Sequence, residues 1–169
     1  GEFMIQLPWM QATQSNFTSA LNNLRRVESR RKDIKEETRR IEAQLAGLFK
    51  SRGVNVLVGF HPPAISGGRN PGEIDLICAK DGMVLVIEVK SSHLRKSKLD
   101  AWIYRTENLR KAQRQIERKV YEVRRLLKVD PELLKDLGLV GELGELPITG
   151  WIVDTCIEYD HMRFGGFLK

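Results

Sequence analysis

Two carboxylates and one ammonium group stand at the ends of two strongly apolar segments. They belong to Asp75, Glu88 and Lys90, with twelve residues between the aspartate and the glutamate. Ionic groups beside core-like residues are costly to bury unless they are paired or bind a metal. Carboxylate oxygens suit a hard cation such as Mg²⁺ or Mn²⁺, which orients phosphate and acidifies water, while lysine stabilises developing negative charge. This set therefore predicts metal-dependent phosphodiester hydrolysis.

A β-hairpin is the element that must position these groups. Residues 73–79 and 83–90 are apolar and rich in Val and Ile, and the intervening Lys80-Asp81-Gly82 is a tight turn of the Asp-Gly type. Side chains alternate along a strand, so Glu88 and Lys90 share one face with the valines at 84 and 86. Antiparallel pairing brings Asp75 near the same end. The hairpin therefore predicts converging charges.

The surrounding pattern predicts a mixed α/β domain. We expect a helix from residue 34 to about 48, a strand at 54–60, a loop at 61–72 and irregular structure at 91–102. A long amphipathic helix at 109–127, a short helical piece at 132–137 and a strand at 148–157 follow. A strand meander followed by a helical crossover predicts a mixed sheet flanked by helices.

The spacing of Asp75 and Glu88-Val89-Lys90 resembles the PD-(D/E)XK nuclease superfamily. The wording of residues 72–77 and 86–90 is similar to its nuclease-related and Holliday-junction-resolvase-like branches. The resemblance covers roughly residues 35–157 and implies a restriction-endonuclease-like α-β-β-β-α-β core. One departure is that Ile74, not proline, precedes the aspartate.

The resemblance also implies roles for individual residues. Asp75 and Glu88 would be metal ligands for Mg²⁺ or Mn²⁺, the backbone carbonyl of Val89 a further ligand, and Lys90 the catalytic lysine. The implied activity is hydrolysis of DNA by an intracellular enzyme of prokaryotic or phage origin. Double-strand cutting would favour a homodimer, by analogy.

A further acidic ligand is expected from the first helix. Glu36, Glu37 and Glu42 are the candidates, and helical phase relative to Leu45 places Glu42 nearest the sheet-facing stripe. The wording of residues 41–54 also resembles the first-helix motif of the resolvase-like branch, with Glu42 at its acidic position. We expect Glu42 to join the metal site. Glu73 is either a strand-end charge or a spare ligand.

The basic surplus predicts a polyanionic partner. The chain has a net charge of +6 and a pI near 9.5. Residues 105–128 hold nine Lys and Arg against three Glu, a surplus equal to that of the whole chain. The alternative is a solvated basic helix face. Lys111, Gln115 and Lys119 share a flank beside the apolar stripe, and the resemblance implies that a Gln or Lys of this helix supports the site. Trp102, Tyr104 and Tyr121 either stack on bases or pack in the core. The residues expected to contact nucleic acid are Lys111, Gln115, Lys119, Arg69 and Ser91.

Length and composition predict one domain in 169 residues. Residues 1–3 resemble a cloning scar, residues 4–33 an N-terminal arm and helix, and residues 34–169 the nuclease-like domain. The tail ends without a stop signal, which is compatible with a piece of a longer protein. No apolar run reaches membrane length and no signal peptide is evident, so we expect a cytoplasmic protein without membrane partners. Cys78 and Cys156 are expected to be buried thiols in a reducing compartment.

Two other functions stay open at this point. A nucleic-acid-binding module could keep the same fold without turnover, although the full acidic-acidic-lysine set argues against it. A small-molecule enzyme is the weakest alternative, because no glycine-rich phosphate loop follows a strand and no nucleophile elbow is present.

Overall fold

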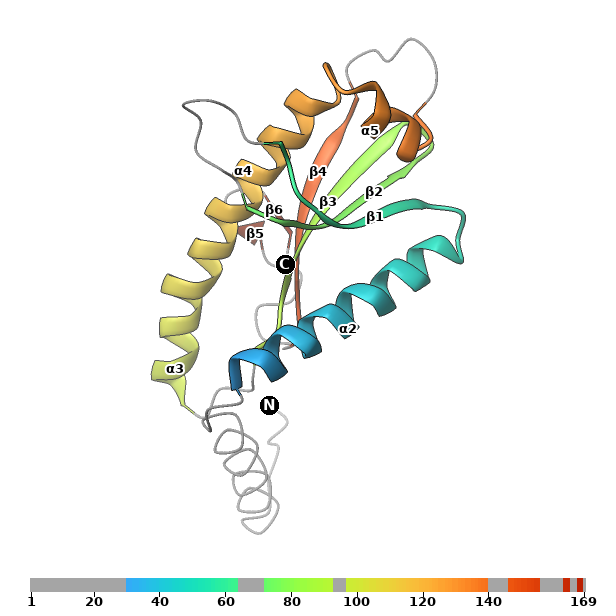
Figure 1. Ribbon diagram of the computed structural model, residues 1–169. Helices are drawn as coiled ribbons and strands as arrows, with labels where there is room; N and C mark the ends of the chain where they lie inside the picture. The colour runs from blue at the N-terminus through green and yellow to red at the C-terminus, as the bar shows by residue number, and fades with distance from the viewer. Residues whose placement is uncertain are drawn as a thin grey trace, which may run out of the picture.

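The computed structural model describes residues 30–63, 72–92, 97–139, 146–155, 163–164 and 167–168. The predicted N-terminal arm, Arg69 and Cys156 lie outside these residues, apart from the last four positions of the arm. Within them, the chain forms a mixed α/β structure whose helices pack on a six-stranded sheet (Figure 1). The α/β class predicted from the pattern is confirmed.

Helix α2 (Arg30–Lys50) is the predicted first helix, and it begins four residues before the expected start. Its apolar positions Ile41, Leu45 and Phe49 recur at helical spacing and pack against one face of the sheet. Gly53 adopts a φ of +71° and donates its N–H to the carbonyl of Lys50, which ends the helix before the first strand.

The sheet has the order β1-β2-β3-β4-β6-β5. Strands β1 (Asn55–Phe60), β2 (Ile74–Lys80) and β3 (Met83–Lys90) pair antiparallel. Strand β4 (Ile148–Asp154) pairs parallel to β3, as the helical crossover requires. The two-residue strands β5 (Arg163–Phe164) and β6 (Phe167–Leu168), which the sequence pattern does not predict, extend the sheet beyond β4.

The predicted hairpin between β2 and β3 is confirmed. Asp81 and Gly82 have φ values of +50° and +73°, the pair of positive angles that a type I′ turn needs. The turn fixes the register, so that Leu76 lies opposite Ile87 and Lys80 opposite Met83. Asp75 therefore comes level with the Glu88 end of its partner strand.

The prediction of irregular structure at 91–102 is wrong for its last part. Helix α3 (Lys98–Ile103) begins there, with Ser97 as its N-cap accepting a hydrogen bond from the backbone N–H of Asp100. A π-helical segment η1 (Tyr104–Leu109) joins α3 to the predicted long helix α4 (Arg110–Leu126). The helix thus starts well before the apolar periodicity does. Helix α5 (Pro131–Asp136), the predicted short helical piece, follows and is capped by Asp130.

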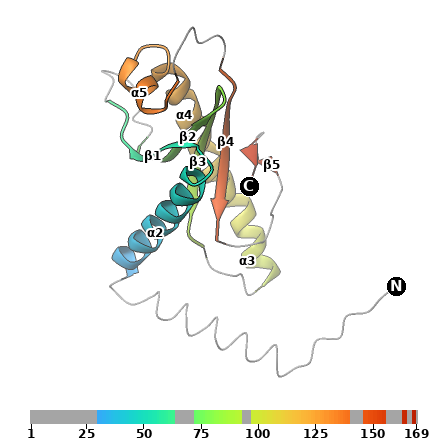
Figure 2. The ribbon, with the colours of Figure 1, turned by 90° about the vertical axis from the view of Figure 1, so that its right-hand side faces the viewer.

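Helices α2 and α4 cover opposite faces of the sheet (Figure 2). The α4 face buries Ile77, Val84 and Val86 together with the apolar stripe of α4. The α2 face buries Leu76, Ile87 and Val89. Each strand therefore sends alternate side chains to different helices, and the face of α4 is the one that receives Glu88 and Lys90.

Cys78 lies on the α2 face and is buried, as predicted. Burial raises the pKa of its thiol to about 11, which keeps it protonated. No helix among the described residues is both long enough and apolar enough to cross a membrane.

Candidate functional site

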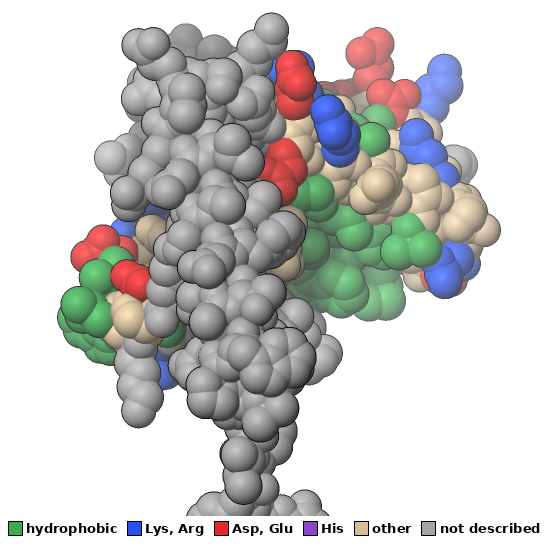
Figure 3. Space-filling view, turned by 90° about the horizontal axis from the view of Figure 1, so that it is seen from below, with side chains coloured by type: hydrophobic (Ala, Val, Ile, Leu, Met, Phe, Trp, Pro, Cys, Tyr) green, Lys and Arg blue, Asp and Glu red, His purple; other side chains and the backbone are tan. Residues whose placement is uncertain are grey.

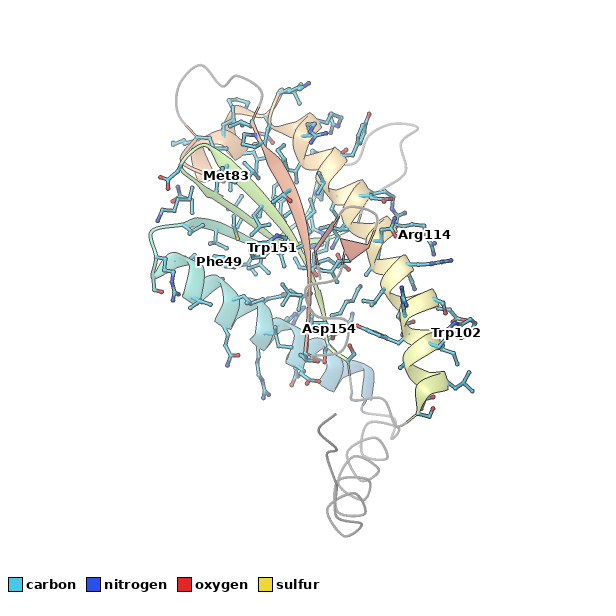
Figure 4. All side chains as sticks on the ribbon, turned by 180° about the vertical axis from the view of Figure 1, so that it is seen from behind. Phe49, Met83, Trp102, Arg114, Trp151 and Asp154 are labelled. Carbon is cyan, nitrogen blue, oxygen red and sulfur yellow. The ribbon has the colours of Figure 1, made fainter. Side chains whose placement is uncertain are left out.

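The hairpin and helix α4 bring a set of ionic side chains together at one end of the sheet. Glu88 and Lys90 follow Val84 and Val86 on the α4 face of β3, and Asp75 precedes Ile77 on the same face of β2. This end is opposite the hairpin turn. In Figure 4, Met83 at the start of β3 lies far from Asp154, the register partner of Lys90 at the end of β4.

Asp75 uses both of its carboxylate oxygens. Oδ2 accepts a 2.6 Å hydrogen bond from the backbone N–H of Val89, just beyond the last backbone pair of the β2–β3 ladder. Oδ1 accepts a 2.7 Å hydrogen bond from Nζ of Lys119 on α4. The side chain is 14% exposed. Asp75 therefore ties the two strands and the helix together.

Glu88 is almost completely buried and also uses both oxygens. Its Oε1 lies 2.5 Å from Nζ of Lys90, two residues further along the same face of β3. Its Oε2 accepts a hydrogen bond from Nζ of Lys119. Lys119 thus bridges the two predicted metal ligands, Asp75 and Glu88, and only 4% of its side chain is exposed.

The pKa shifts follow from this burial and pairing. Burial and the nearby Glu88 charge raise the pKa of Asp75, and Lys119 and the Val89 N–H oppose that shift. Burial alone would lower the pKa of Lys119, but the two carboxylates outweigh it and raise the pKa. Lys119 is therefore held as a cation between the two carboxyl groups.

Lys90 is held from a second side by Gln115. Its Nζ donates a 3.0 Å hydrogen bond to Oε1 of this α4 residue, one helical turn before Lys119. A third of the Lys90 side chain remains exposed, so its ammonium is the more accessible of the two. The structure places Gln115 and Lys119 against the carboxylate–lysine set, which agrees with the supporting role that the resemblance implies for a Gln or Lys of this helix.

Glu42 of α2 lies within the electrostatic influence of this set. Burial raises its pKa to about 7, the charges of Asp75 and Glu73 act in the same direction, and Lys119 and Arg39 act against it. Such a carboxyl is partly protonated near neutral pH. Glu36, by contrast, is exposed on α2. Glu37 is half-buried, as Glu42 is, so burial separates Glu42 from Glu36 and not from Glu37.

The three carboxylates do not form a closed metal cage. In the described part of the chain, no three His, Cys, Asp or Glu side chains gather closely enough to hold an ion. The donor chemistry of Asp75 and Glu88 nevertheless fits a hard cation, because the pair offers buried, converging carboxylate oxygens. Lys119 supplies the positive charge between them.

A second polar network anchors the chain just after Lys90. Ser91 and Ser92 are half-buried there. Ser92 Oγ hydrogen-bonds to Oδ1 of Asp154 and, at 3.3 Å, to the hydroxyl of Tyr104 on η1. Its backbone N–H donates to Oγ1 of Thr155 at 2.9 Å. These contacts fix the end of β3 to β4 and η1, and nothing in the sequence pattern predicts them.

The basic residues of α4 are divided between the site and the solvent. Lys111 is exposed, one turn before Gln115. Arg114 projects away from the sheet (Figure 4), and Arg118 donates from Nε to its backbone carbonyl at 3.1 Å. Arg110 is exposed as well. The outer flank of α4 is therefore positively charged, as the composition predicted.

The three aromatic candidates also divide. Tyr104 is buried and packs with Leu109, whereas Trp102 is 60% exposed and Tyr121 70% exposed. Trp102 and its neighbours Leu99 and Ile103 are exposed apolar residues of α3. Hydrophobic side chains are visible on the left of the molecule seen from below, where α3 lies (Figure 3). Core packing therefore accounts for Tyr104 and not for the other two.

Comparisons with protein-family models, with curated proteins and with solved structures give no significant match to this chain.

Proposed function

We propose that this protein is a Mg²⁺-dependent nuclease that hydrolyses DNA phosphodiester bonds, with a restriction-endonuclease-like core of the PD-(D/E)XK type. The observation that carries the proposal is the convergence of Asp75, Glu88 and Lys90 on one sheet face. The element order of helix, three antiparallel strands, helix and parallel strand supports the proposed core.

In this proposal, Asp75 and Glu88 would hold the cation, and the carbonyl of Val89 and the carboxylate of Glu42 would be further ligands. The bound ion supplies Lewis-acid stabilisation of the phosphate and a water of lowered pKa. Lys90, with its ammonium partly exposed, donates hydrogen bonds to the negative charge that develops on the phosphate. Gln115 holds that ammonium by accepting its hydrogen bond.

DNA is the proposed substrate because the positive charge lies on the outer flank of α4, next to the site. Arg110, Lys111, Arg114 and Arg118 are exposed there. Lys and Arg side chains bind backbone phosphates without reading bases, and such contacts give affinity that falls with salt. Arg69 and Ser91 remain proposed contacts, and Arg69 lies outside the described residues.

Cleavage of supercoiled plasmid and of branched and single-stranded oligonucleotides, in Mg²⁺ or Mn²⁺, tests the proposal. We expect metal-dependent cutting by the wild type and a loss of at least about a hundredfold in Lys90→Ala. The control is Lys80→Ala, because Lys80 lies at the opposite end of β2, where its ammonium donates to the carbonyl of Arg52. Equal, background-level cutting by wild type and Lys90→Ala on every substrate would exclude catalysis.

A nucleic-acid-binding module without turnover is the second candidate, and one observation favours it. Lys119 and Lys90 together balance the formal charges of Asp75 and Glu88, so the four side chains form an ion network that needs no metal for charge balance. Calorimetric titration with Mn²⁺ separates the two functions. A nuclease shows a binding event that Asp75→Asn abolishes, whereas a binding module shows DNA affinity without it.

A further inference from the structure

The ammonium of Lys119 lies where the two proposed metal ligands converge. It donates to Oδ1 of Asp75 at 2.7 Å and to Oε2 of Glu88. The other oxygen of each carboxylate also accepts a hydrogen bond, from the Val89 N–H and from Nζ of Lys90. A cation entering between the carboxylates must therefore replace existing contacts.

Lys119 is a buried residue of α4. It is 3% exposed and is flanked on the inner face of α4 by Ile116, Val120 and Val123, which are all buried. Its position is fixed by the docking of the helix on the sheet. Positive charges repel strongly at short range in a poorly solvated site. A divalent ion and the Lys119 ammonium thus exclude each other from the same pair of oxygens.

We propose that Lys119 is a built-in competitor for the divalent cation, so that metal binds only when the Lys119 ammonium leaves the Asp75–Glu88 pair. This inference rests on the proposed function, since it concerns the same carboxylates. It makes the site a two-state element: closed by an internal cation, or open and filled by an external one. The metal affinity then depends on how much more favourably the divalent ion binds the two carboxylates than the Lys119 ammonium does, and not on the carboxylates alone.

The test is the affinity for Mn²⁺ in the absence of DNA. Isothermal titration calorimetry at fixed ionic strength compares the wild type with Lys119→Met, which removes the charge and keeps an unbranched side chain. Lys128→Met is the matched control, because it makes the same substitution at an exposed lysine just beyond the end of α4. We expect Lys119→Met to bind Mn²⁺ at least about tenfold more tightly than the wild type, with Lys128→Met within about twofold.

Adding Asp75→Asn to Lys119→Met must abolish the increase in Mn²⁺ affinity, which shows that the increase arises at this site. Removal of Lys119 leaves two carboxylates facing each other, which favours binding of a proton by one of them. The titrations are therefore run at pH 7.5 and pH 8.5, where protons compete less with Mn²⁺. Circular dichroism and thermal melting establish that each variant is folded. If Lys119→Met does not fold, Lys119→Gln replaces it, because its neutral amide keeps a hydrogen-bond donor on the side chain.

Two outcomes overturn the inference and are distinguishable. An unchanged or weaker Mn²⁺ affinity in a folded Lys119 variant means that Lys119 does not compete, and leaves the proposed nuclease standing. No Mn²⁺ binding by any variant, including Lys119→Met, removes the metal site itself and the proposed function with it.

Discussion

Lys90 on β3 and Gln115 on α4 are joined by a 3.0 Å hydrogen bond from the ammonium to the amide oxygen. This bond links the proposed catalytic lysine to the helix that carries the basic surface. Gln115→Ala removes the acceptor without changing charge, so we expect cleavage to fall about 10–100-fold, as for other residues that orient a ligand or catalytic group. Single-turnover cleavage measures it. If Gln115→Ala binds DNA and cleaves it at the same rate as the wild type, Gln115 does not position Lys90.

Glu88 is expected to be the most stabilising acidic side chain of the site. Glu88→Ala leaves the buried Lys119 ammonium with one carboxylate in place of two and removes the carboxylate partner of the half-buried Lys90. Breaking a buried ion pair from one side costs about 3–5 kcal/mol in the free energy of unfolding. The control is Glu73→Ala, because the contact of Glu73 with His61 is exposed, spans 3.8 Å and is an ion pair only while the imidazole is protonated, when it is worth less than about 1 kcal/mol. Urea unfolding gives the free energy of unfolding of each variant, and equal losses in Glu88→Ala and Glu73→Ala would contradict the prediction.

Glu42 should make stability depend on pH. Its pKa is raised from 4.5 to about 7, so the folded protein holds a proton there that the unfolded chain has lost. The contribution of Glu42 to stability is therefore present at acidic pH and is lost as the pH rises toward and through 7. We expect Glu42→Gln and wild type to have similar stability near pH 5, and the variant to gain relative to wild type at pH 8. Urea titrations across this range, without metal, test the sign, and a constant difference would refute the shifted pKa.

Two glycines should respond oppositely to alanine. Gly138 has a φ of +63°, and a Cβ there would clash with Nδ2 of Asn55, which donates to the carbonyl of Leu137 at 3.0 Å. Gly138→Ala should destabilise the fold by about 1–2 kcal/mol from the backbone strain alone. Gly47 lies in α2, where an added Cβ would meet nothing within 4 Å, so Gly47→Ala should stabilise by up to about 1 kcal/mol. Thermal unfolding of both variants gives the comparison.

The exposed flank of α4 should set the salt dependence of DNA binding. Each phosphate contact contributes a slope of about −0.9 in a plot of log affinity against log salt concentration for duplex DNA. The double variant Lys111→Ala/Arg114→Ala should reduce the magnitude of that slope by up to about 1.8. Lys135→Ala, an exposed lysine on α5, is the control. Equal slopes for the double variant and the wild type would place the DNA elsewhere.

The hairpin and its charges could be predicted because the information is local. Strand alternation and the Asp81-Gly82 turn together determine that Asp75 and Glu88 face the same helix, and the structure has this arrangement. The start of α3 was missed because its signal is a single N-cap, Ser97, without an apolar repeat behind it. A short helix with exposed Leu99 and Trp102 gives no amphipathic pattern to find.

The position of Lys119 was missed for a different reason, although the sequence contained a signal for it. Lys119 is three residues after Ile116 and four before Val123, which places it within the apolar stripe of the helix and not on its flank. A lysine in that phase must find anions on the surface it packs against. The prediction puts Lys119 on the flank beside the apolar stripe, as a residue that contacts nucleic acid or supports the site, and does not identify its partners, which lie on strands more than thirty residues earlier in the chain.

The same lysine has a consequence for how the molecule assembles. The hairpin with Asp75 and Glu88 closes over a short stretch of sequence, whereas α4 must dock on it from a distance along the chain. An axial slip of α4 by one turn in either direction would present Gln115 or Val123 to the two carboxylates in place of an ammonium. We expect Lys119 to disfavour such displaced arrangements, because they leave the two buried carboxylates without this cation. The helix and the hairpin then have a single low-energy alignment.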